Sequence, residues 1–291
     1  HYALVTLEAL TAHGVHSGKS DRVQDVVLLR DANGLPALPG TSIAGVLRHL
    51  YRDAHGEIAT RALFGCADED EGGNSLLRVG WGLVHDSADQ PVEGLRPDIG
   101  DDALLEHLAQ RHPLVRERVR LDARGTAEDT GKFDVTLVPA GTRYSLLLNF
   151  WSDGTQEEEA CWQHILALLA SPGFRLGHGT RSGAGAFRVE ALHTQRWDLT
   201  TPEGKSGFME RPRTRAGARA LPATSIPDAG HPLSVTLRLK SEGGWRIGGG
   251  DAPFGLDSEQ QPDLMPQSEW RIQWQQGRGV LGQRQDLVPA S

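Results

Sequence analysis

The order of strand-like and helical segments constrains the fold of this chain more than any other feature of its sequence. Strand-like segments alternate apolar and polar residues, imperfectly in the first of them, and helical segments repeat apolar residues every three or four positions. The segments follow one another as strand, helix, strands, helix and strand–loop–strand, over residues 4–11, 41–51, 76–84, 133–151, 157–169 and 174–192. This order predicts an α+β protein with a ferredoxin-like antiparallel sheet and long insertions between residues 86 and 118.

Glycine is the residue type in excess. The chain has 35 glycines among its 291 residues, whereas an average composition of about 7% would give roughly 20. They follow no collagen-like period. The excess predicts many tight turns, or many places at which the backbone closely approaches a ligand.

Composition excludes several classes of protein. Hydrophobic residues make up 38% of the chain, enough for a packed core, and the length suggests about two domains. No stretch approaches the ~18 consecutive apolar residues of a membrane span, and no secretory signal is visible. The two cysteines, Cys66 and Cys161, are too few for a disulfide framework or a four-cysteine zinc site. We therefore expect a cytoplasmic protein that does not associate with membranes.

Basic residues are clustered although the chain as a whole is acidic. The formal net charge of −8 argues against an indiscriminate nucleic-acid binder. Residues 111–124, however, carry five arginines against two acids, a balance of +3, and residues 205–219 carry five basic residues against one acid, a balance of +4. Residues 174–188 contain three arginines and no acid. Each cluster is either a solvated face or a local groove for a phosphate chain, and the glycine-rich surroundings favour grooves.

The chain divides into three parts. Residues 1–196 contain all the segments described above, and residues 197–231 form a basic, Pro- and Gly-rich stretch that predicts a linker or mobile arm. Beyond it, the Val-Thr-Leu sequence of residues 5–7 returns at residues 235–237. We interpret residues 232–291 as part of a second, similar module in a piece of a longer protein, and the alternative is a chance echo.

A Pro-Gly turn leads into the first helix. Thr41 or Ser42 is expected to cap the free N–H groups of the first turn, where the helix dipole favours an anion. Arg48, about two turns further along, would reach a second phosphate. The alternative is a capped helix with a purely structural role.

A second motif lies between two strands, at residues 176–187. It combines four glycines with Thr180, Arg181 and Ser182, which suits contacts between backbone N–H groups and phosphates. Its spacing is neither that of a dinucleotide fingerprint nor that of a Walker A loop. The alternative is a long glycine-rich hairpin.

Together these stretches resemble the RAMP (repeat-associated mysterious protein) superfamily, specifically the backbone subunits of type III CRISPR effector complexes. The family's Pro-Gly turn and helix is similar to residues 39–48, with Ala44 in place of the usual lysine. Its Leu-Phe-Gly triplet, its Val-Pro-x-Gly region and its C-terminal glycine-rich loop are similar to residues 63–65, 122–141 and 176–185. Order and spacing agree over roughly residues 3–192.

The resemblance implies a ferredoxin-like, RRM-related palm that stacks with other effector-complex subunits along a CRISPR RNA. It also implies a thumb hairpin, here residues 122–133, that wedges into the duplex of guide and target RNA. On this basis the candidate RNA-binding residues are His13, His16, Ser17, Gly18, Arg22, Thr41, Ser42, Arg48, Gly177, His178, Gly179, Thr180, Arg181 and Arg246.

The resemblance further implies that the chain is an endoribonuclease, with Asp25 at the family's target-cutting position. Cleavage of an RNA backbone needs the 2′-hydroxyl in line with the scissile phosphate, and a loop carboxylate can orient that hydroxyl. The same carboxylate can hold a divalent cation, Mg²⁺ or Mn²⁺, although the sequence identifies no metal ligands. Candidates for a second cutting carboxylate are Asp251, Asp257 and Asp263.

Three other functions remain open. The chain could scaffold RNA without cutting it, in which case Asp25 is inert. It could instead process guide precursors with His13 or His16 as the acid–base group. In a third alternative the glycines belong to an ordinary β-rich enzyme that does not bind nucleic acid.

Overall fold

A computed structural model describes residues 1–16, 27–66, 72–124, 126–228 and 264–289 of the chain. The central sheet is built on three long strands, β1 (Tyr2–Ala9), β7 (Arg143–Phe150) and β8 (Phe187–Gln195), and β1 pairs antiparallel with both of the others. The short strands β3 (Leu77–Val79) and β4 (Gly82–Val84) pair with the other edge of β7.

Strand order identifies the type of sheet. From one edge to the other it runs β8, β1, β7 and then β3 and β4, and β2 (Ala37–Leu38) extends the edge at β4. A helix follows β1 and another follows β7, so the chain runs strand, helix, strand, strand, helix, strand with neighbouring strands antiparallel. The predicted ferredoxin-like fold is therefore confirmed.

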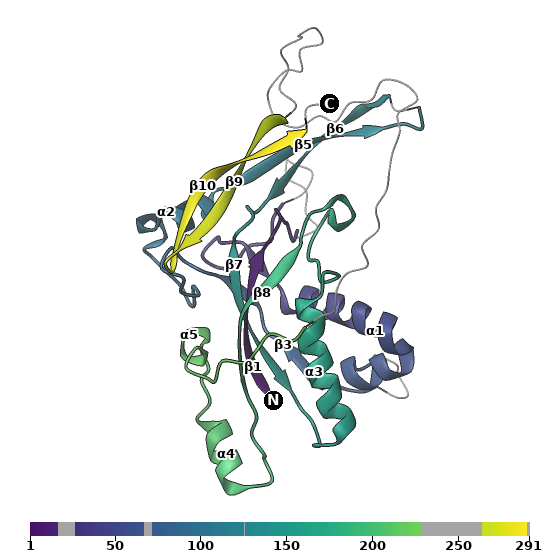
Figure 1. The fold of residues 1–291 in the computed structure, drawn as a ribbon, viewed down its shortest axis with the longest axis vertical. Helices are drawn as coiled ribbons and strands as arrows, with labels where there is room; N and C mark the ends of the chain where they lie inside the picture. The colour runs from purple at the N-terminus through teal and green to yellow at the C-terminus, as the bar shows by residue number, and fades with distance from the viewer. Residues whose placement is uncertain (17–26, 67–71, 125, 229–263, 290–291) are drawn as a thin grey trace.

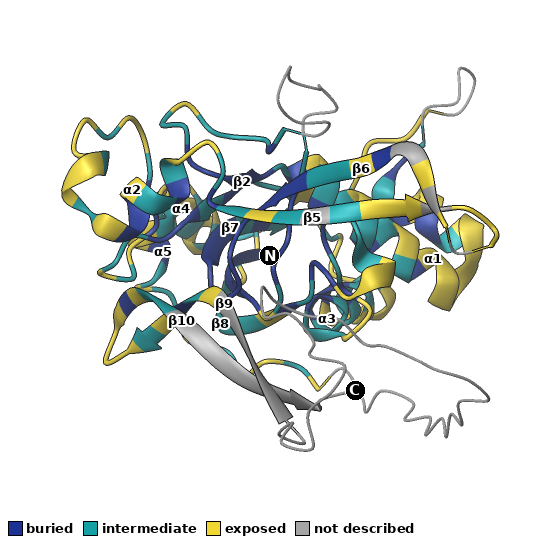
Figure 2. Cartoon of the chain, turned by 90° about the horizontal axis from the view of Figure 1, so that it is seen from above, coloured by how far each residue is buried: buried dark blue, intermediate teal, exposed yellow. Residues whose placement is uncertain are grey.

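Helices α1 (Gly40–Phe64) and α3 (Gln156–Ala170) lie together on one face of the sheet (Figure 1). Their apolar stripes, including Ile43, Leu47 and Ile165, pack against alternate residues of β1 in the main core. The helix faces that point away from the sheet are exposed, whereas the long central strands are mostly buried (Figure 2). The helix predicted from residue 157 to residue 169 is thus confirmed within one residue.

Helix α1 differs from the prediction in its start and its length. Pro39 is the N-cap residue, and no side chain accepts a hydrogen bond at this end, so neither Thr41 nor Ser42 caps the helix. The helical segment extends beyond residue 51 to Phe64, with an interruption at Gly56, whose φ of +80° lies in the left-handed region. A single apolar stripe does not reveal this continuation, because the second part of the helix is largely exposed.

Strand β1 is buried along its whole length because both faces of the sheet are covered. On the face opposite α1 and α3, Tyr2 and Leu4 pack against Ala218 of α5 (Arg215–Ala218). Burial on both faces removes the need for polar residues at alternate positions. This explains the imperfect alternation of residues 4–11 in the sequence.

The segment predicted as a linker or mobile arm supplies this second cover. Residues 197–228 contain α4 (Pro202–Met209) and α5 instead of an irregular linker. Arg215 holds α5 against the sheet, because its guanidinium contacts Glu93 at 3.0 Å and donates to the Ser145 carbonyl at 2.9 Å. The sequence does not indicate these helices, because the long-range contacts that hold them leave no trace in local apolar periodicity.

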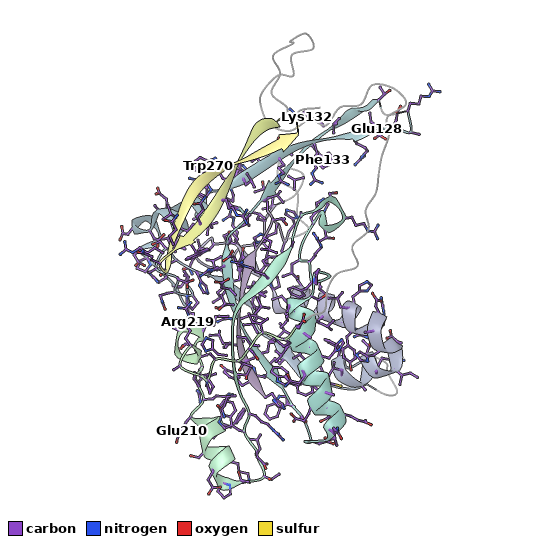
Figure 3. The ribbon with its side chains drawn as sticks, in the orientation of Figure 1. Glu128, Lys132, Phe133, Glu210, Arg219 and Trp270 are labelled. Atoms are coloured by element: carbon purple, nitrogen blue, oxygen red, sulfur yellow. The ribbon has the colours of Figure 1, made fainter. Side chains whose placement is uncertain are left out.

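Two hairpins complete the described structure. The first, β5 (Leu114–Leu121) with β6 (Ala127–Leu137), projects beyond the palm, and Glu128 lies near its tip (Figures 1 and 3). The expected thumb at residues 122–133 covers its turn and part of β6. The second is β9 (Leu264–Gln275) with β10 (Arg278–Pro289), and β10 contacts α2 (Ala103–Ala109).

The second hairpin is joined to the palm by a buried ion cluster. Arg143, at the start of β7, contacts the carboxylates of Glu8, Asp89 and Glu190 at 2.9, 3.2 and 2.9 Å. Its guanidinium also stacks on the ring of Trp274 in β9, at 4.3 Å from the centroid. The interpretation of residues 232–291 as a second module stays a prediction, because residues 229–263 lie outside the described structure.

Within the part that is described, no helix has the length and apolar character needed to cross a bilayer.

Candidate nucleic-acid interface

Three segments that are far apart in the sequence line one open groove with a volume of about 720 Å³. They are the loop after β1, the N-terminal turns of α1, and the glycine-rich loop before β8. Side chains and backbone come from Gly14, Val15, His16, Thr41, Ser42, Gly45, Val46, His49, Leu50, Gly173, Arg175, Leu176, Gly177, His178 and Thr180. Among these described lining residues there are three histidines and one arginine but no aspartate or glutamate.

Backbone contacts hold the glycine-rich loop against the loop after β1. The His178 N–H donates to the Gly14 carbonyl at 2.8 Å, and the Gly185 N–H donates to the Ala12 carbonyl at 3.0 Å. Gly177 has a φ of +92°, and a Cβ added there would lie only 2.3 Å from the Gly14 oxygen. Only glycine allows so close an approach, so part of the glycine excess serves packing within the protein.

The first turn of α1 faces the groove, and the structure gives its N-cap residue, Pro39, no side-chain hydrogen bond. Thr41 is exposed, no side chain caps this end, and the first turn contains no acidic residue. A Cβ on Gly40 would lie 2.1 Å from the Val79 carbonyl oxygen, so glycine is needed for the helix to start against β3. The positive end of the helix dipole is therefore fixed at the groove, where it favours an anion.

Two histidines approach each other on the opposite side of the groove. His16 Nε2 is 3.1 Å from the Thr136 carbonyl oxygen in β6, and the His16 and His178 rings lie 5.8 Å apart. Burial lowers the pKa of His16, and the neighbouring His178 lowers it further, against the opposing effect of the Thr136 carbonyl. Both rings can donate hydrogen bonds to phosphate oxygens when they are protonated.

The projecting hairpin adds a basic residue to the rim of this region. A Cβ built on Gly179 would lie 3.6 Å from Nη2 of Arg118, which places the guanidinium of this β5 residue beside the glycine-rich loop. The basic cluster of residues 111–124 therefore belongs to the hairpin, and one of its arginines lies beside the glycine-rich loop.

Six of the candidate RNA-binding residues come together in the groove. With Gly177 counted, the six that line the groove are His16, Thr41, Ser42, Gly177, His178 and Thr180. Gly179 and the exposed Arg181 belong to the same glycine-rich loop but do not line the groove.

Two further candidates are corrected by the structure. His13 is 1% exposed, and its Nε2 is 2.9 Å from the Tyr144 hydroxyl, so its ring is part of the core and has no access to RNA. Arg48 points toward the end of α1, where Nη1 donates to the Gly65 carbonyl at 3.3 Å and Nη2 lies 3.6 Å from Glu57. The helical spacing of Arg48 from Thr41 therefore does not bring it to the same phosphate path.

Several candidates lie outside the described residues, and their roles stay predictions. In the first module they are Ser17, Gly18, Arg22 and Asp25, and in the last part of the chain they are Arg246, Asp251, Asp257 and Asp263. Within the described ranges, no group of three or more His, Cys, Asp or Glu side chains is arranged to hold a metal ion.

Two basic residues that line the groove, Arg175 and His49, are not among the candidates predicted from the sequence. His49 could have been found from helical periodicity, because it follows Thr41 and Gly45 at intervals of four residues on one face of α1. Arg175 was counted in a basic cluster, but no local signal separates it from the neighbouring Arg181.

Comparisons with known proteins identify the superfamily to which the chain belongs. A search of curated proteins found no match. Among solved structures, a chain of a type IV-B CRISPR complex is similar at 18% identity and a TM-score of 0.46, over 69% of this chain and 95% of that one. A chain of an apo type III-B Cmr-beta complex is similar at 15% identity and a TM-score of 0.48, over 65% and 96%. A chain of that complex bound to cognate target RNA is similar at 12% identity and a TM-score of 0.44, over 66% and 59%. The model of the RAMP superfamily matches residues 6–188, well over half of the sequence, and the chain belongs to that superfamily.

Proposed function

We propose that the groove binds the phosphate backbone of a CRISPR RNA and that the chain is an RNA-binding subunit of a type III effector complex. The observation that carries this proposal is the composition of the groove. The chain has 38 acidic and 30 basic residues, yet no carboxylate is found among the described residues that line the groove. A local surface of this kind attracts a polyanion even though the whole protein is acidic.

Each wall of the groove offers a different kind of phosphate contact. The first turn of α1 supplies the positive end of a helix dipole together with the Thr41 and Ser42 hydroxyls. The glycine-rich loop supplies backbone groups with no bulky side chains in the way, and Arg175 supplies a positive charge. None of these groups reads a base edge, so the proposal is binding of the backbone with little sequence preference.

The hairpin β5–β6 is the part of this proposal that meets the target strand. It leaves the palm beside the groove, with Arg118 next to Gly179, and extends beyond the sheet (Figure 1). A projecting arm with basic residues at its base is suited to contact a second RNA strand paired with the first. We therefore propose target RNA and other effector-complex subunits as the further partners.

We also propose that Asp25 cleaves the target RNA. His16, a groove residue, pairs in an antiparallel bridge with Leu28. Asp25 stands three positions before Leu28 in the sequence. The carboxylate would orient the 2′-hydroxyl for attack on the adjacent phosphate. A divalent cation, if it takes part, would be held through the Asp25 carboxylate, because hard oxygen ligands suit Mg²⁺ or Mn²⁺.

Two alternatives to target cleavage by Asp25 are compatible with the groove. An RNA scaffold without cleavage needs only the groove. A guide-processing ribonuclease would need an acid–base histidine, and only His16 of the two original candidates reaches the groove, because His13 is buried.

The test of RNA binding is fluorescence anisotropy of a labelled single-stranded guide RNA at increasing salt concentrations. We expect affinity to fall steeply with salt, by about 0.7 logarithmic units per tenfold change for each phosphate contact. The double variant Arg175→Gln/His178→Gln should bind about tenfold more weakly and with a smaller slope. Arg181→Gln is the matched control, because Arg181 is exposed on the same loop but does not line the groove. Equal affinity of wild type and double variant would exclude the groove as the binding site.

A further inference from the structure

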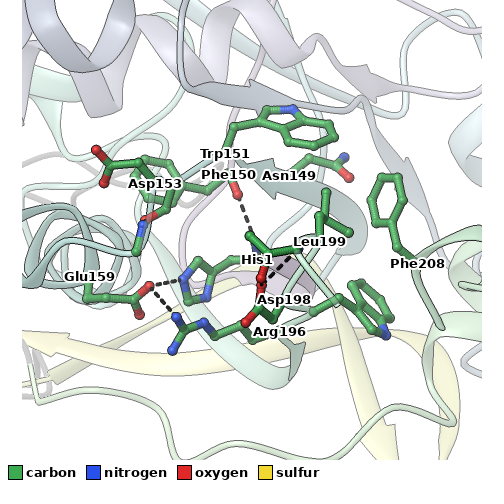
Figure 4. Close-up of a pocket in the computed structure, with 14 residues that line it drawn as sticks. His1, Asn149, Phe150, Trp151, Asp153, Glu159, Arg196, Asp198, Leu199 and Phe208 are labelled. Atoms are coloured by element: carbon green, nitrogen blue, oxygen red, sulfur yellow. Dashed lines mark hydrogen bonds and ion pairs between the residues drawn. The ribbon is translucent and has the colours of Figure 1, made fainter. Parts of the chain in front are cut away.

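A second cavity, of about 420 Å³, lies at the end of the palm sheet opposite the RNA groove. It is bordered by the end of β7, the turn that follows it, the first turn of α3, and the segment from Arg196 to α4. Figure 4 shows the rings of Trp151 and Phe208 at its border, with Glu159 and Arg196 on another side. Neither the sequence motifs nor the RNA proposal assigns a role to this cavity.

The cavity has an aromatic wall. The Trp151 and Phe208 rings meet edge to face at 5.5 Å, and the Trp197 and Phe208 rings do so at 5.9 Å. Trp151 keeps 47% of its surface exposed. A large aromatic side chain left open in a pocket, with its ring fixed by neighbours, is typical of a recognition surface.

The aromatic cluster already binds one guanidinium. The Cζ atom of Arg211 lies 3.8 Å from the centroid of the Phe208 ring. Arg211 does not line the cavity, so this stacking occupies a part of the cluster outside it. The attraction between a ring face and a cation is therefore realised in this cluster within the protein itself.

The lining side chains carry an excess of negative charge. Among the lining side chains, three carboxylates, of Asp153, Glu159 and Asp198, stand against one guanidinium, of Arg196. His1 also lines the cavity: its ring Nε2 lies 2.8 Å from Glu159, and its amino group donates to the Phe150 carbonyl. Arg196 Nη2 lies 3.6 Å from Glu159, so that cation is already paired. Hydrogen bonds from Thr200 lower the pKa of Asp198, which keeps its carboxylate ionised at neutral pH.

We propose that this cavity binds an arginine or lysine side chain presented by a peptide segment of a partner protein. Aromatic rings would stack on the cation and its aliphatic stem, and the carboxylates would neutralise its charge. A nucleobase could also stack on Trp151, but the negative charge of the lining would repel the phosphates attached to it. The proposal is independent of RNA binding, because the two sites lie at opposite ends of the eight-residue strand β1, about 26 Å long.

The experiment measures binding of a fluorescent Gly-Arg-Gly-Arg-Gly peptide to the wild-type chain by anisotropy. We expect saturable binding that weakens as salt is added, because exposed charges are screened. A peptide with citrulline in place of both arginines is isosteric but uncharged, and should bind about tenfold more weakly. This comparison needs no protein variant, so it holds even if a substitution disturbs folding.

Variants then locate the site. Trp151→Ala should reduce peptide affinity about tenfold, whereas Trp81→Ala should leave it unchanged. Trp81 is a matched control, because it is 46% exposed but lies outside the cavity. Absence of peptide binding at millimolar concentration, or equal binding of the citrulline peptide or of Trp151→Ala, would overturn the proposal. Binding of labelled hexa-adenylate that depends on Trp151, without peptide binding, would assign the cavity to a nucleobase instead.

Discussion

The two ends of strand β1 carry opposite chemistry. Beyond Ala9 lies a groove lined by glycines, hydroxyls, histidines and Arg175, with no carboxylate among its described residues. Beside Tyr2 lies a cavity of aromatic rings with three carboxylates and one arginine. Both are formed where strands end and loops begin, so the same sheet positions them. The difference between them lies in the side chains that the loops supply.

This comparison shows why a net charge describes a protein poorly. A net charge of −8 predicts weak interaction with nucleic acid if the charge is assumed to be spread evenly over the surface. Separation of charge over the length of β1 allows one end to attract a polyanion and the other to attract a cation. Four predictions, from the largest expected effect to the smallest, test whether the two ends are independent and whether each has the chemistry assigned to it.

The largest effect is expected for Asp25→Ala. If Asp25 orients the attacking hydroxyl, cleavage of guide-paired target RNA should fall more than a hundredfold while guide binding stays within a few-fold. The measurement is single-turnover cleavage on a denaturing gel, with and without EDTA to test the need for a divalent cation. Cleavage at an unchanged rate and position would assign the chain to the non-catalytic scaffold.

The controls for this prediction come from the other carboxylates and the other end of the sheet. Asp251→Ala, Asp257→Ala and Asp263→Ala should leave the cut that depends on Asp25 unchanged, and any second cut that one of them removes identifies the second carboxylate. Trp151→Ala should leave both cuts unchanged. Loss of cleavage in Trp151→Ala with intact folding would show that the two ends of the sheet are coupled.

The second prediction concerns the packing of the groove itself. Gly177→Ala combines a left-handed backbone with a Cβ placed 2.3 Å from the Gly14 oxygen. We expect a loss of about 3 kcal/mol in the free energy of unfolding and weaker RNA binding. Gly183→Ala has the same kind of backbone, with a φ of +85°, but open space around its Cβ, and should lose only about 1 kcal/mol. Urea unfolding measures the free energy of unfolding of both variants. Equal losses in the two variants would mean that backbone strain alone, and not the contact with Gly14, accounts for the effect.

The third prediction uses the buried His13 beneath the groove. Burial lowers the pKa of His13 to about 3, so the folded state keeps it neutral while the unfolded chain binds a proton below about pH 6.5. Its contribution to stability is therefore present at neutral pH and falls as the pH drops through that range. Between about pH 7 and about pH 5 the free energy of unfolding should decrease by about 2 kcal/mol more in wild type than in His13→Gln.

Urea unfolding at the two pH values measures this difference, and His178→Gln serves as the control because His178 is exposed. The opposite is expected for RNA binding: His178→Gln should lower the affinity for RNA, whereas His13→Gln, as long as it is folded, should leave that affinity unchanged. A pH dependence of unfolding that is unchanged in His13→Gln would contradict the assignment of His13 to the core.

The smallest effect is expected from a carboxylate added to the groove. Gly45 is exposed in α1, and a Cβ there meets no atom within 4 Å, so a side chain is accommodated. Gly45→Glu should weaken RNA binding about tenfold through repulsion of phosphates, and Gly45→Ala should leave it unchanged. Gly45→Ala should also raise the free energy of unfolding by about 0.5–1 kcal/mol, because glycine is a poor helix former. Equal RNA affinity in both variants would show that RNA does not pass along α1.

Much of the palm could be predicted from the sequence because its elements have strong local signals. The first turn of α3 contains three glutamates and its apolar stripe is regular, so its limits were predicted closely. The break between β6 and β7 follows from the Pro139-Ala140-Gly141 turn. Strand β1 was recognised despite its irregular alternation, which only the covering of both sheet faces explains.

Contacts between distant segments could not be predicted in this way. The strand predicted at residues 76–84 is divided into β3 and β4, with the exposed Trp81 between them. The basic segment after residue 196 is predicted as a linker because its helices are short and are held by contacts with distant residues, such as those of Arg215 with Glu93 and of Ala218 with Tyr2. The cavity at Trp151 depends on the same segment, so no sequence motif indicated it.

The sequence by itself determined the strand and helix order, the superfamily resemblance, and most of the residue types available for binding phosphate. These depend on local periodicity and on short motifs, which are properties of neighbouring residues. The tertiary structure decided which of those residues act together: it placed His16, Thr41 and His178 in one groove, buried His13, and turned Arg48 away. The physical reason is that the direction of a side chain depends on which distant surface its element packs against, and the sequence of the element does not contain that surface.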